Sequence, residues 1–132
     1  MLFRSNVASI KALMLADFVA AAEIQQVSTG ISPNIHSVLY IIHTQYMKNI
    51  TLESVAKQMN YTPYYLSRLF KKHTGNTFTE YLSNYRIEQS KKLIREGKMS
   101  IKEIAAAVGF NSQGYFAKIF KKYTGVSPGE FK

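Results

Sequence analysis

Cysteine is absent from this chain of 132 residues. Its absence excludes disulfide scaffolds, thiolate zinc sites and cysteine nucleophiles. It is also compatible with a reducing cytoplasm, where we expect the protein to reside. Carboxylates are few, with eight Asp and Glu against seventeen Lys and Arg, and they are scattered along the chain. They offer no pattern typical of acid–base catalysis.

Histidine is also scarce, and its three positions lack the spacing of a metal site. His36 and His43 are seven residues apart on an expected helix, and His73 stands alone. Surface or satisfied histidines explain these positions better than catalysis does. The chain has no glycine-rich phosphate loop and no grouping of Ser, His and Asp. We therefore predict that the protein is not an enzyme and takes no metal or cofactor.

Long hydrophobic runs are missing, with one apparent exception near the start. Lys11 precedes the run Leu13–Ala22, an arrangement that imitates a secretory signal. Asp17 interrupts this run, and its ten residues are too few to cross a bilayer core of about 30 Å. We therefore expect neither secretion nor a membrane partner.

The positive charge is concentrated in one half of the chain. Residues 1–67 hold four Lys or Arg against three Asp or Glu, whereas residues 68–132 hold thirteen against five. The second half thus carries a surplus of eight out of the net charge of +9. Such asymmetry indicates a polyanionic partner, with nucleic acid the leading candidate and a device for solubility the alternative.

Two segments of the chain are similar enough to be a repeat. Residues 51–61, TLESVAKQMNY, align with residues 100–110, SIKEIAAAVGF, at an offset of 49. Residues 66–75, LSRLFKKHTG, align with residues 116–125, FAKIFKKYTG, at an offset of 50. The extra residue falls between the two parts, and turns tolerate insertions better than helices do. Each copy is therefore predicted to be two helices joined by a turn, a helix-turn-helix unit.

Capping residues set the expected boundaries of these helices. Thr51 and Ser100 are hydroxyl N-caps for the first helix of each copy. The second helices have matching boundary residues: Thr62-Pro63 and Ser112 at their starts, Gly75 and Gly125 at their ends.

Three further helices are expected from similar boundaries. One begins at Ser32-Pro33 and runs to about Asn49. A long one begins at a capping box of Thr77 and Glu80 and ends at about Glu96. A short one begins at Ser127-Pro128. With no strand pattern and no low-complexity linker, the prediction is an all-α fold of seven helices.

The second helix of each copy has an inner side and a cationic outer side. The spacing i, i+3, i+4, i+7 defines the inner side: Leu66, Leu69, Phe70 and His73 in one copy, Phe116, Ile119, Phe120 and Tyr123 in the other. The outer side carries short polar groups with Arg and Lys, which suits a DNA major groove. The helix 77–96 would span about 30 Å, close to the roughly 34 Å between successive major grooves on one duplex face.

These residues resemble the DNA-binding domain of the AraC/XylS family of bacterial transcription regulators. The resemblance rests on ITLESVAKQMNYTPYYLSRLFKKHTG, YLSNYRIEQSKKLI and SIKEIAAAVGFNSQGYFAKIFKKYTGVSPGEFK. It covers residues 32–132 and implies two helix-turn-helix subdomains, 32–76 and 98–132, joined by a linker helix at 77–97. It also implies binding to double-stranded promoter DNA, contact with RNA polymerase, transcription activation and a regulatory domain in the full-length protein.

The resemblance also implies which residues contact bases. They are outward positions early in each second helix: Tyr64, Ser67 and Arg68, then Gln113, Gly114, Tyr115, Ala117 and Lys118. Phosphate contacts are assigned to two lysine pairs and two helix N-termini: Lys71, Lys72, Lys121, Lys122, Thr51 and Ser100. Arg68 can grip guanine O6 and N7 with two hydrogen bonds, whereas Gly114 and Ala117 have no hydrogen-bonding side chain. The second helix is therefore expected to discriminate less between bases than the first.

One alternative function stays open at this point. A sequence-independent architectural protein that coats or bends DNA would carry similar charge.

The role of residues 1–31 also stays open. They place several apolar side chains on one stripe: Val7, Ile10, Met14, Ala21 and Ile24. This segment fits a short dimerising helix, the tail of a regulatory domain, or a helix packed on the DNA-binding domain equally well.

Overall fold

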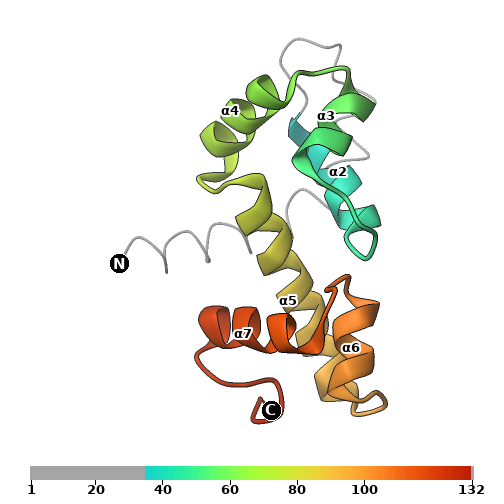
Figure 1. Cartoon of the computed structure of the whole chain (residues 1–132). Coiled ribbons are helices and arrows are strands. Elements are labelled where there is room, and N and C mark those ends of the chain that lie inside the picture. The colour runs from blue at the N-terminus through green and yellow to red at the C-terminus, as the bar shows by residue number, and fades with distance from the viewer. Residues whose placement is uncertain (1–34, 132) are drawn as a thin grey trace. The chain divides into compact units, whose positions relative to one another are not determined.

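The structure, a computed structural model, describes residues 35–131 of the chain. These residues form six α-helices and no strand, so the predicted all-α class is confirmed. In chain order the helices are α2 (Ile35–Gln45), α3 (Leu52–Met59), α4 (Pro63–Thr74), α5 (Phe78–Glu96), α6 (Ile101–Ala107) and α7 (Gln113–Thr124) (Figure 1). The expected segment 1–31, the expected helix start at Ser32-Pro33, and Lys132 lie outside the described residues.

The seventh helix, expected from Ser127, is absent among residues 35–131, and that prediction is wrong. Residues 128–130 form a turn in which the Glu130 N–H donates to the Ser127 carbonyl over 3.1 Å. The Ser127 hydroxyl donates to the Glu130 carboxylate over 2.8 Å, so the expected capping pair forms without a helix behind it. A capping pair alone does not offset the free-energy cost of nucleating a helix.

The first described helix, α2, ends at Gln45 instead of near Asn49. The next four residues, Tyr46–Asn49, leave the helix and pack with the C-terminal half of the chain. Their carbonyl groups are used there: the Arg86 guanidinium donates to the Tyr46 carbonyl over 2.8 Å and to the Lys48 carbonyl over 2.9 Å. These hydrogen bonds give the carbonyls partners that a continuing helix would otherwise supply.

The chain folds as two compact units, each containing one helix-turn-helix. The first unit contains residues 35–45 and 50–82, with α3 and α4 as its helix-turn-helix pair. The second contains Tyr46–Asn49 and residues 83–131, with α6 and α7 as its pair.

Helix α5 contributes residues 78–82 to the first unit and its remaining residues to the second. It begins at the predicted capping box, where the Thr77 N–H donates to the Glu80 carboxylate over 2.9 Å. It ends where predicted, at Gly97, which adopts a left-handed backbone with φ of 69°. A single helix of 19 residues therefore belongs to both units.

The boundaries of α4 and α7 are also those expected from the sequence. The hydroxyls of Thr62 and Ser112 each accept a hydrogen bond of 3.1 Å from the N–H three residues further on. Pro63 occupies the first turn of α4, where a missing N–H costs least. Gly75 and Gly125 close the two helices with φ of 75° and 87°. The two copies of the repeat are thus bounded by the same physical devices.

The core of the first unit is built from apolar side chains of α2, α3, α4 and the start of α5. Those with no more than 1% exposure are Val38, Leu39, Ile42, Val55, Ala56, Leu66, Phe70 and Tyr81. The Phe70 ring lies edge-on to Phe78 and Tyr81, with centroids 5.8 and 5.3 Å away. His43 is buried beside this cluster, where its Nε2 lies 2.8 Å from the Tyr81 hydroxyl. Burial lowers the pKa of His43 to about 4.

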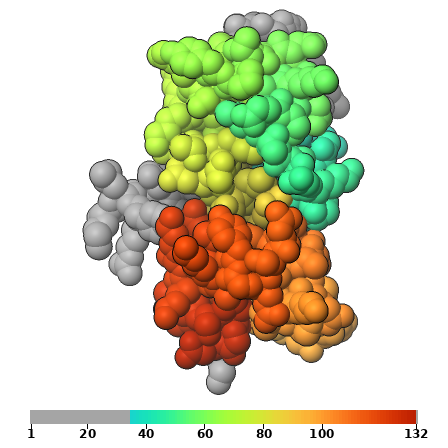
Figure 2. Space-filling model, in the orientation of Figure 1, coloured from blue at the N-terminus to red at the C-terminus, as the bar shows by residue number. Residues whose placement is uncertain are grey.

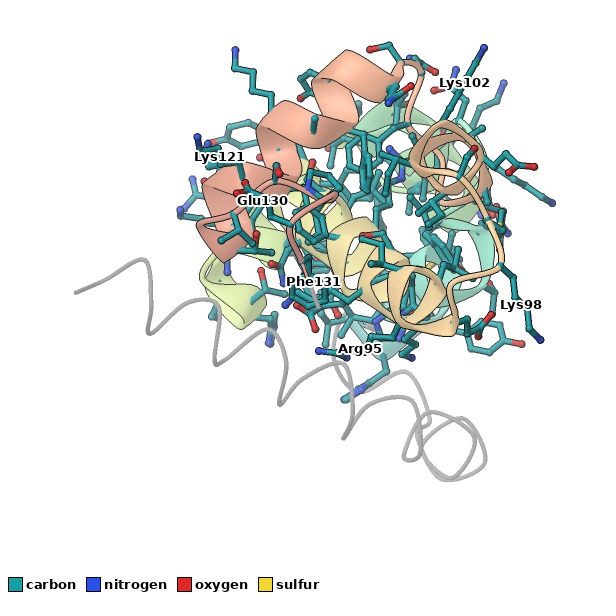
Figure 3. All side chains as sticks on the ribbon, turned by 90° about the horizontal axis from the view of Figure 1, so that it is seen from below. Arg95, Lys98, Lys102, Lys121, Glu130 and Phe131 are labelled. Carbon is teal, nitrogen blue, oxygen red and sulfur yellow. The ribbon has the colours of Figure 1, made fainter. Side chains whose placement is uncertain are left out.

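The core of the second unit is built around aromatic rings. Its buried members are Ile87, Ile104, Ala105, Val108, Phe110, Phe116 and Phe120. The Phe131 ring packs edge-on against Phe120 at 5.3 Å and lies beneath the Arg95 guanidinium at 5.1 Å. In Figure 3, Phe131 lies beside α5, whereas Lys98 and Lys102 reach away from the ribbon. Each unit thus buries an apolar core, while most of its cations, with Arg86 and Lys91 as exceptions, are exposed to solvent.

Candidate nucleic-acid interface

The second helix of each helix-turn-helix is termed its recognition helix, and in the first unit this is α4. Its inner side is buried through Leu66, Leu69 and Phe70, which pack against α2 and α3. Its outer side exposes every position predicted there to contact a base: Tyr64, Ser67 and Arg68. His73, which the spacing placed on the inner side, is exposed because Thr74 turns inward at that end of the helix.

Arg68 is held by a neighbour on the same outer side of α4. Its Nη1 donates to the Tyr64 hydroxyl over 2.8 Å, one helical turn earlier. Its guanidinium carbon lies 5.6 Å from the centre of the Tyr64 ring, within cation–π range. An arginine carries five N–H donors, so four remain after this hydrogen bond. Two are enough to bind guanine O6 and N7.

The recognition helix of the second unit, α7, has a similar inner side and a different outer side. Phe116 and Phe120 are fully buried. Four predicted base-contacting positions are exposed, namely Gln113, Gly114, Tyr115 and Lys118, whereas Ala117 is half-buried. The α7 surface, orange to red in Figure 2, is turned toward the viewer. A Cβ added at Gly114 would meet no atom within 4 Å, so packing does not require glycine there.

Tyr115 has a structural partner that the sequence did not reveal. Its ring lies 5.9 Å from that of Phe110 in the turn before α7. The first unit repeats this arrangement with Tyr65 and Tyr61, whose rings lie 5.0 Å apart. Both pairs anchor the start of a recognition helix to its turn. Tyr65, which was not among the predicted base contacts, therefore occupies the position equivalent to Tyr115 and is also exposed.

The lysines assigned to phosphates lie at the far ends of the recognition helices. Lys71, Lys72, Lys121 and Lys122 are all exposed, and none of them forms an ion pair within residues 35–131. Lys121 extends away from α7 in Figure 3. Ammonium groups without a neighbouring carboxylate are available to a polyanion, whose counterions they would displace.

The two helix N-termini assigned to phosphates are capped differently. The Thr51 N–H donates to the Ser54 hydroxyl over 2.9 Å, so this cap is neutral. The Ser100 N–H donates to the Glu103 carboxylate over 2.8 Å. Hydrogen bonds from the Ser100 backbone and side chain lower the pKa of Glu103, which stabilises its charged form. A fixed negative charge therefore competes with a phosphate at α6, and α3 also carries a carboxylate, Glu53, in its first turn.

Arg86 of α5 connects Tyr46 and Lys48 to the turn before α7, a role that was not predicted from the sequence. Besides its bonds to the Tyr46 and Lys48 carbonyls, its guanidinium carbon lies 5.8 Å from the Phe110 ring in the turn. Burial lowers the pKa of Arg86, against a smaller opposing effect of Tyr115. An arginine between the buried Tyr85 and Ile87 is the sequence feature that could have indicated an inward-facing cation.

Gly109 leaves room for this arrangement at the turn of the second unit. Its φ is 101°, and a Cβ there would lie 2.6 Å from the Tyr46 carbonyl oxygen and 2.9 Å from the Arg86 Nε. The equivalent position in the first unit is Asn60, with φ of 60°. Asparagine tolerates that left-handed conformation, whereas the crowding at Gly109 admits glycine alone.

Residues 35–131 contain no group of three or more His, Asp or Glu that could hold a metal ion. In the same part of the chain, no helix is long and apolar enough to cross a membrane. What the recognition helices present to solvent is hydrogen-bonding groups and positive charge.

Comparison with known proteins agrees with this geometry. A family profile described as a helix-turn-helix domain matches residues 55–132, more than half of the chain. The C-terminal domain of AraT, a response regulator from Geobacillus stearothermophilus, is 36% identical and superposes with a TM-score of 0.73, covering 78% of this chain and 86% of that one. The chain belongs to the AraC/XylS family. It therefore carries the DNA-binding helix-turn-helix domain of that family of transcription regulators.

Two relatives place this AraC/XylS domain among longer proteins. The HTH-type transcriptional regulator YtdP of Bacillus subtilis is 35% identical over 96 residues, which make up 73% of this chain and 12% of YtdP. The bifunctional transcriptional activator and DNA repair enzyme AdaA, also of Bacillus subtilis, is 36% identical over 91 residues, 69% of this chain and 43% of AdaA. The chain thus spans less than half the length of either relative.

Proposed function

We propose that this AraC/XylS domain binds promoter DNA sequence-specifically, with α4 and α7 inserted into adjacent major grooves. The observation that supports this proposal is the repetition of one design. Each recognition helix buries an apolar side, exposes a cationic side and contains no carboxylate. One such helix would be ordinary as a solvated face. Two at equivalent positions of a repeat are better explained by a shared polyanionic ligand.

The two recognition helices have different roles in this proposal. In α4, Tyr64, Ser67 and Arg68 contact bases, and Arg68 grips a guanine. In α7, contacts come from Gln113, Gly114, Tyr115, Ala117 and Lys118, with less discrimination because two of these five lack a polar side chain. The lysine pairs of both helices, and the N-termini at Thr51 and Ser100, are assigned to phosphates.

Helix α5 is the spacer between the two DNA-contacting helices in this proposal. Its 19 residues span about 28 Å at 1.5 Å each, near the roughly 34 Å between successive major grooves on one face of B-DNA. A chain with subdomains at 32–76 and 98–132 around this linker would recognise an asymmetric site of about two helical turns without dimerising.

We further propose that the domain acts in the bacterial cytoplasm as part of a longer activator that carries a regulatory domain and contacts RNA polymerase. DNA binding without catalysis is its expected role. The relative AdaA is named a DNA repair enzyme as well, but alkyl transfer in repair proteins of this type needs a cysteine nucleophile. This chain has no cysteine.

Selection of bound DNA from a random pool tests the proposal, because it reports specificity, site length and symmetry together. We expect an asymmetric site near 20 base pairs, about two turns of B-DNA. An inverted or direct duplication would point to a dimer instead. Failure to enrich any sequence, with equal competition by random DNA at physiological salt, would contradict sequence-specific binding and indicate an architectural role.

A further inference from the structure

The contact between Tyr64 and Arg68 has no counterpart in the second copy of the repeat. At the offset of 50 that relates α4 to α7, Tyr64 corresponds to Gly114 and Arg68 to Lys118. Glycine offers no side chain to hold its neighbour one turn away. Lys118 makes no side-chain hydrogen bond within the described residues. The two recognition helices therefore differ in how firmly their outward cation is held.

Holding an arginine before it binds has a thermodynamic consequence. An unrestrained arginine populates many rotamers, and part of that conformational entropy is lost when it docks on a base. The Tyr64 hydroxyl and ring already restrict Arg68, through a 2.8 Å hydrogen bond and a 5.6 Å ring contact. Tyr64 is itself 70% exposed, so this pair stands in solvent on the outer side of α4 instead of in the core. Restraint at this place lowers the cost of docking.

We propose that Tyr64 is a positioning residue, whose hydroxyl orients the Arg68 guanidinium for one guanine and so sets the base preference of α4. This inference rests on the proposed function, because it requires that α4 enters a major groove. It refines the base contact assigned to Tyr64 above, because the Tyr64 hydroxyl acts on base preference through Arg68 and only the ring is left for a contact of its own. The base preference of α4 is then a property of the pair.

The test uses the full chain, its selected DNA site and three derivatives with the guanine under α4 replaced by each other base. Tyr64→Phe removes the hydroxyl and keeps the ring. We expect this variant to lose about three- to tenfold of the preference for guanine, the range for one hydrogen bond, with little change on the replaced sites. In an Arg68→Ala background, Tyr64→Phe should cause no further change in base preference.

Tyr65→Phe is the matched control, because it makes the same chemical change at the next residue, whose ring packs on Tyr61. It should leave the preference for guanine unchanged. Equal weakening on all four sites by Tyr64→Phe, or the same loss with and without Arg68, would overturn the inference while leaving sequence-specific binding intact. A selected site without guanine under α4 would do the same. Failure of the wild-type chain to select any site would overturn both proposals.

A reciprocal variant tests the pair by gain of function. Gly114→Tyr combined with Lys118→Arg places the pair on α7, where a Cβ at position 114 would meet no atom within 4 Å. We expect selection by this double variant to acquire a guanine under α7, and Lys118→Arg alone to acquire it about three- to tenfold less strongly. Equal preference with and without the tyrosine would contradict a positioning role.

Discussion

The two units of this protein share their buried sides and differ in their outward sides and turns. Both recognition helices have a hydroxyl N-cap, at least one buried phenylalanine and a left-handed C-terminal glycine. The first unit turns through Asn60 and presents an arginine held by a tyrosine. The second turns through Gly109, which is crowded by neighbouring atoms, and presents Lys118 one helical turn after Gly114. A repeat can therefore keep the chemistry that folds it while the chemistry facing a ligand diverges.

The difference between the turns gives the largest expected effect. Gly109→Ala should destabilise the second unit by about 3 kcal/mol, because a Cβ meets the Tyr46 carbonyl at 2.6 Å and the backbone has a φ of 101°. Asn60→Ala, the matched change in the first unit, should cost only about 1 kcal/mol for its left-handed backbone. Urea unfolding of both variants measures this. Equal losses of unfolding free energy would show that the crowding around Gly109 does not make its turn less tolerant of a side chain than the turn at Asn60.

The pH dependence of the free energy of unfolding should differ between the two units almost as strongly. The folded-state pKa of His43 is about 4, below its usual 6.5, so the unfolded state binds more protons between these values. Stability of the first unit should fall as pH drops from 6.5, with about 3 kcal/mol lost near pH 4. The second unit has no histidine and should lack this dependence.

A single tryptophan introduced into either unit would report its unfolding, since the chain has none. His43→Gln keeps an amide that can donate to or accept from the Tyr81 hydroxyl, and it should flatten the pH profile of the first unit. A first unit that keeps its stability down to pH 4 would contradict a neutral, buried His43.

The outward cations give the next effect in size, on binding. Arg68→Ala should remove about tenfold to hundredfold of site preference, the discrimination that one bidentate contact to guanine supplies. Lys118→Ala should remove much less, because a single ammonium group makes no fork to O6 and N7. Competition between the selected site and its single-base derivatives measures both. Equal losses would mean that the two recognition helices discriminate alike.

The smallest expected effect concerns the lysine pairs, where the units are alike. Lys71→Gln and Lys121→Gln should each reduce the slope of log affinity against log salt by about 0.9, one phosphate contact apiece. Neither should change base preference, and affinities measured between 50 and 200 mM salt on one DNA fragment suffice as a test. A changed base preference would show that the substituted lysine contacts a base and not a phosphate.

Local chemistry explains why much of the fold was predictable. Caps such as Thr62 and Ser112, and the apolar side of each recognition helix, act over three or four residues and can be read from the sequence. The position of Arg86 could not, because its partners are carbonyls of Tyr46 and Lys48, about forty residues away, and carbonyls carry no residue identity. The helix expected after Ser127 did not form although its capping pair did, because a cap alone does not offset the free-energy cost of nucleating a helix.

The same reasoning applies to the candidate interface. The exposed side of α4 followed from its periodicity, since burial of Leu66 and Phe70 decides where Tyr64 and Arg68 point. The bond between those two residues is a rotamer choice in solvent, which periodicity does not report. The half-buried state of Ala117 and the partner of Tyr115 depend on the packing of α7 onto its turn, which became visible only in three dimensions.

The assignment of Tyr46–Asn49 to the second unit means that no single cut divides this chain into two complete halves. A fragment beginning at Ser83 would leave the Arg86 guanidinium without the Tyr46 and Lys48 carbonyls to which it donates. A fragment ending at Leu82 would contain Tyr46–Asn49 but lack residues 83–132, against which these four residues pack. A fragment of the second unit therefore needs Tyr46–Asn49 in addition to residues 83–132 if it is to fold as it does in the whole chain.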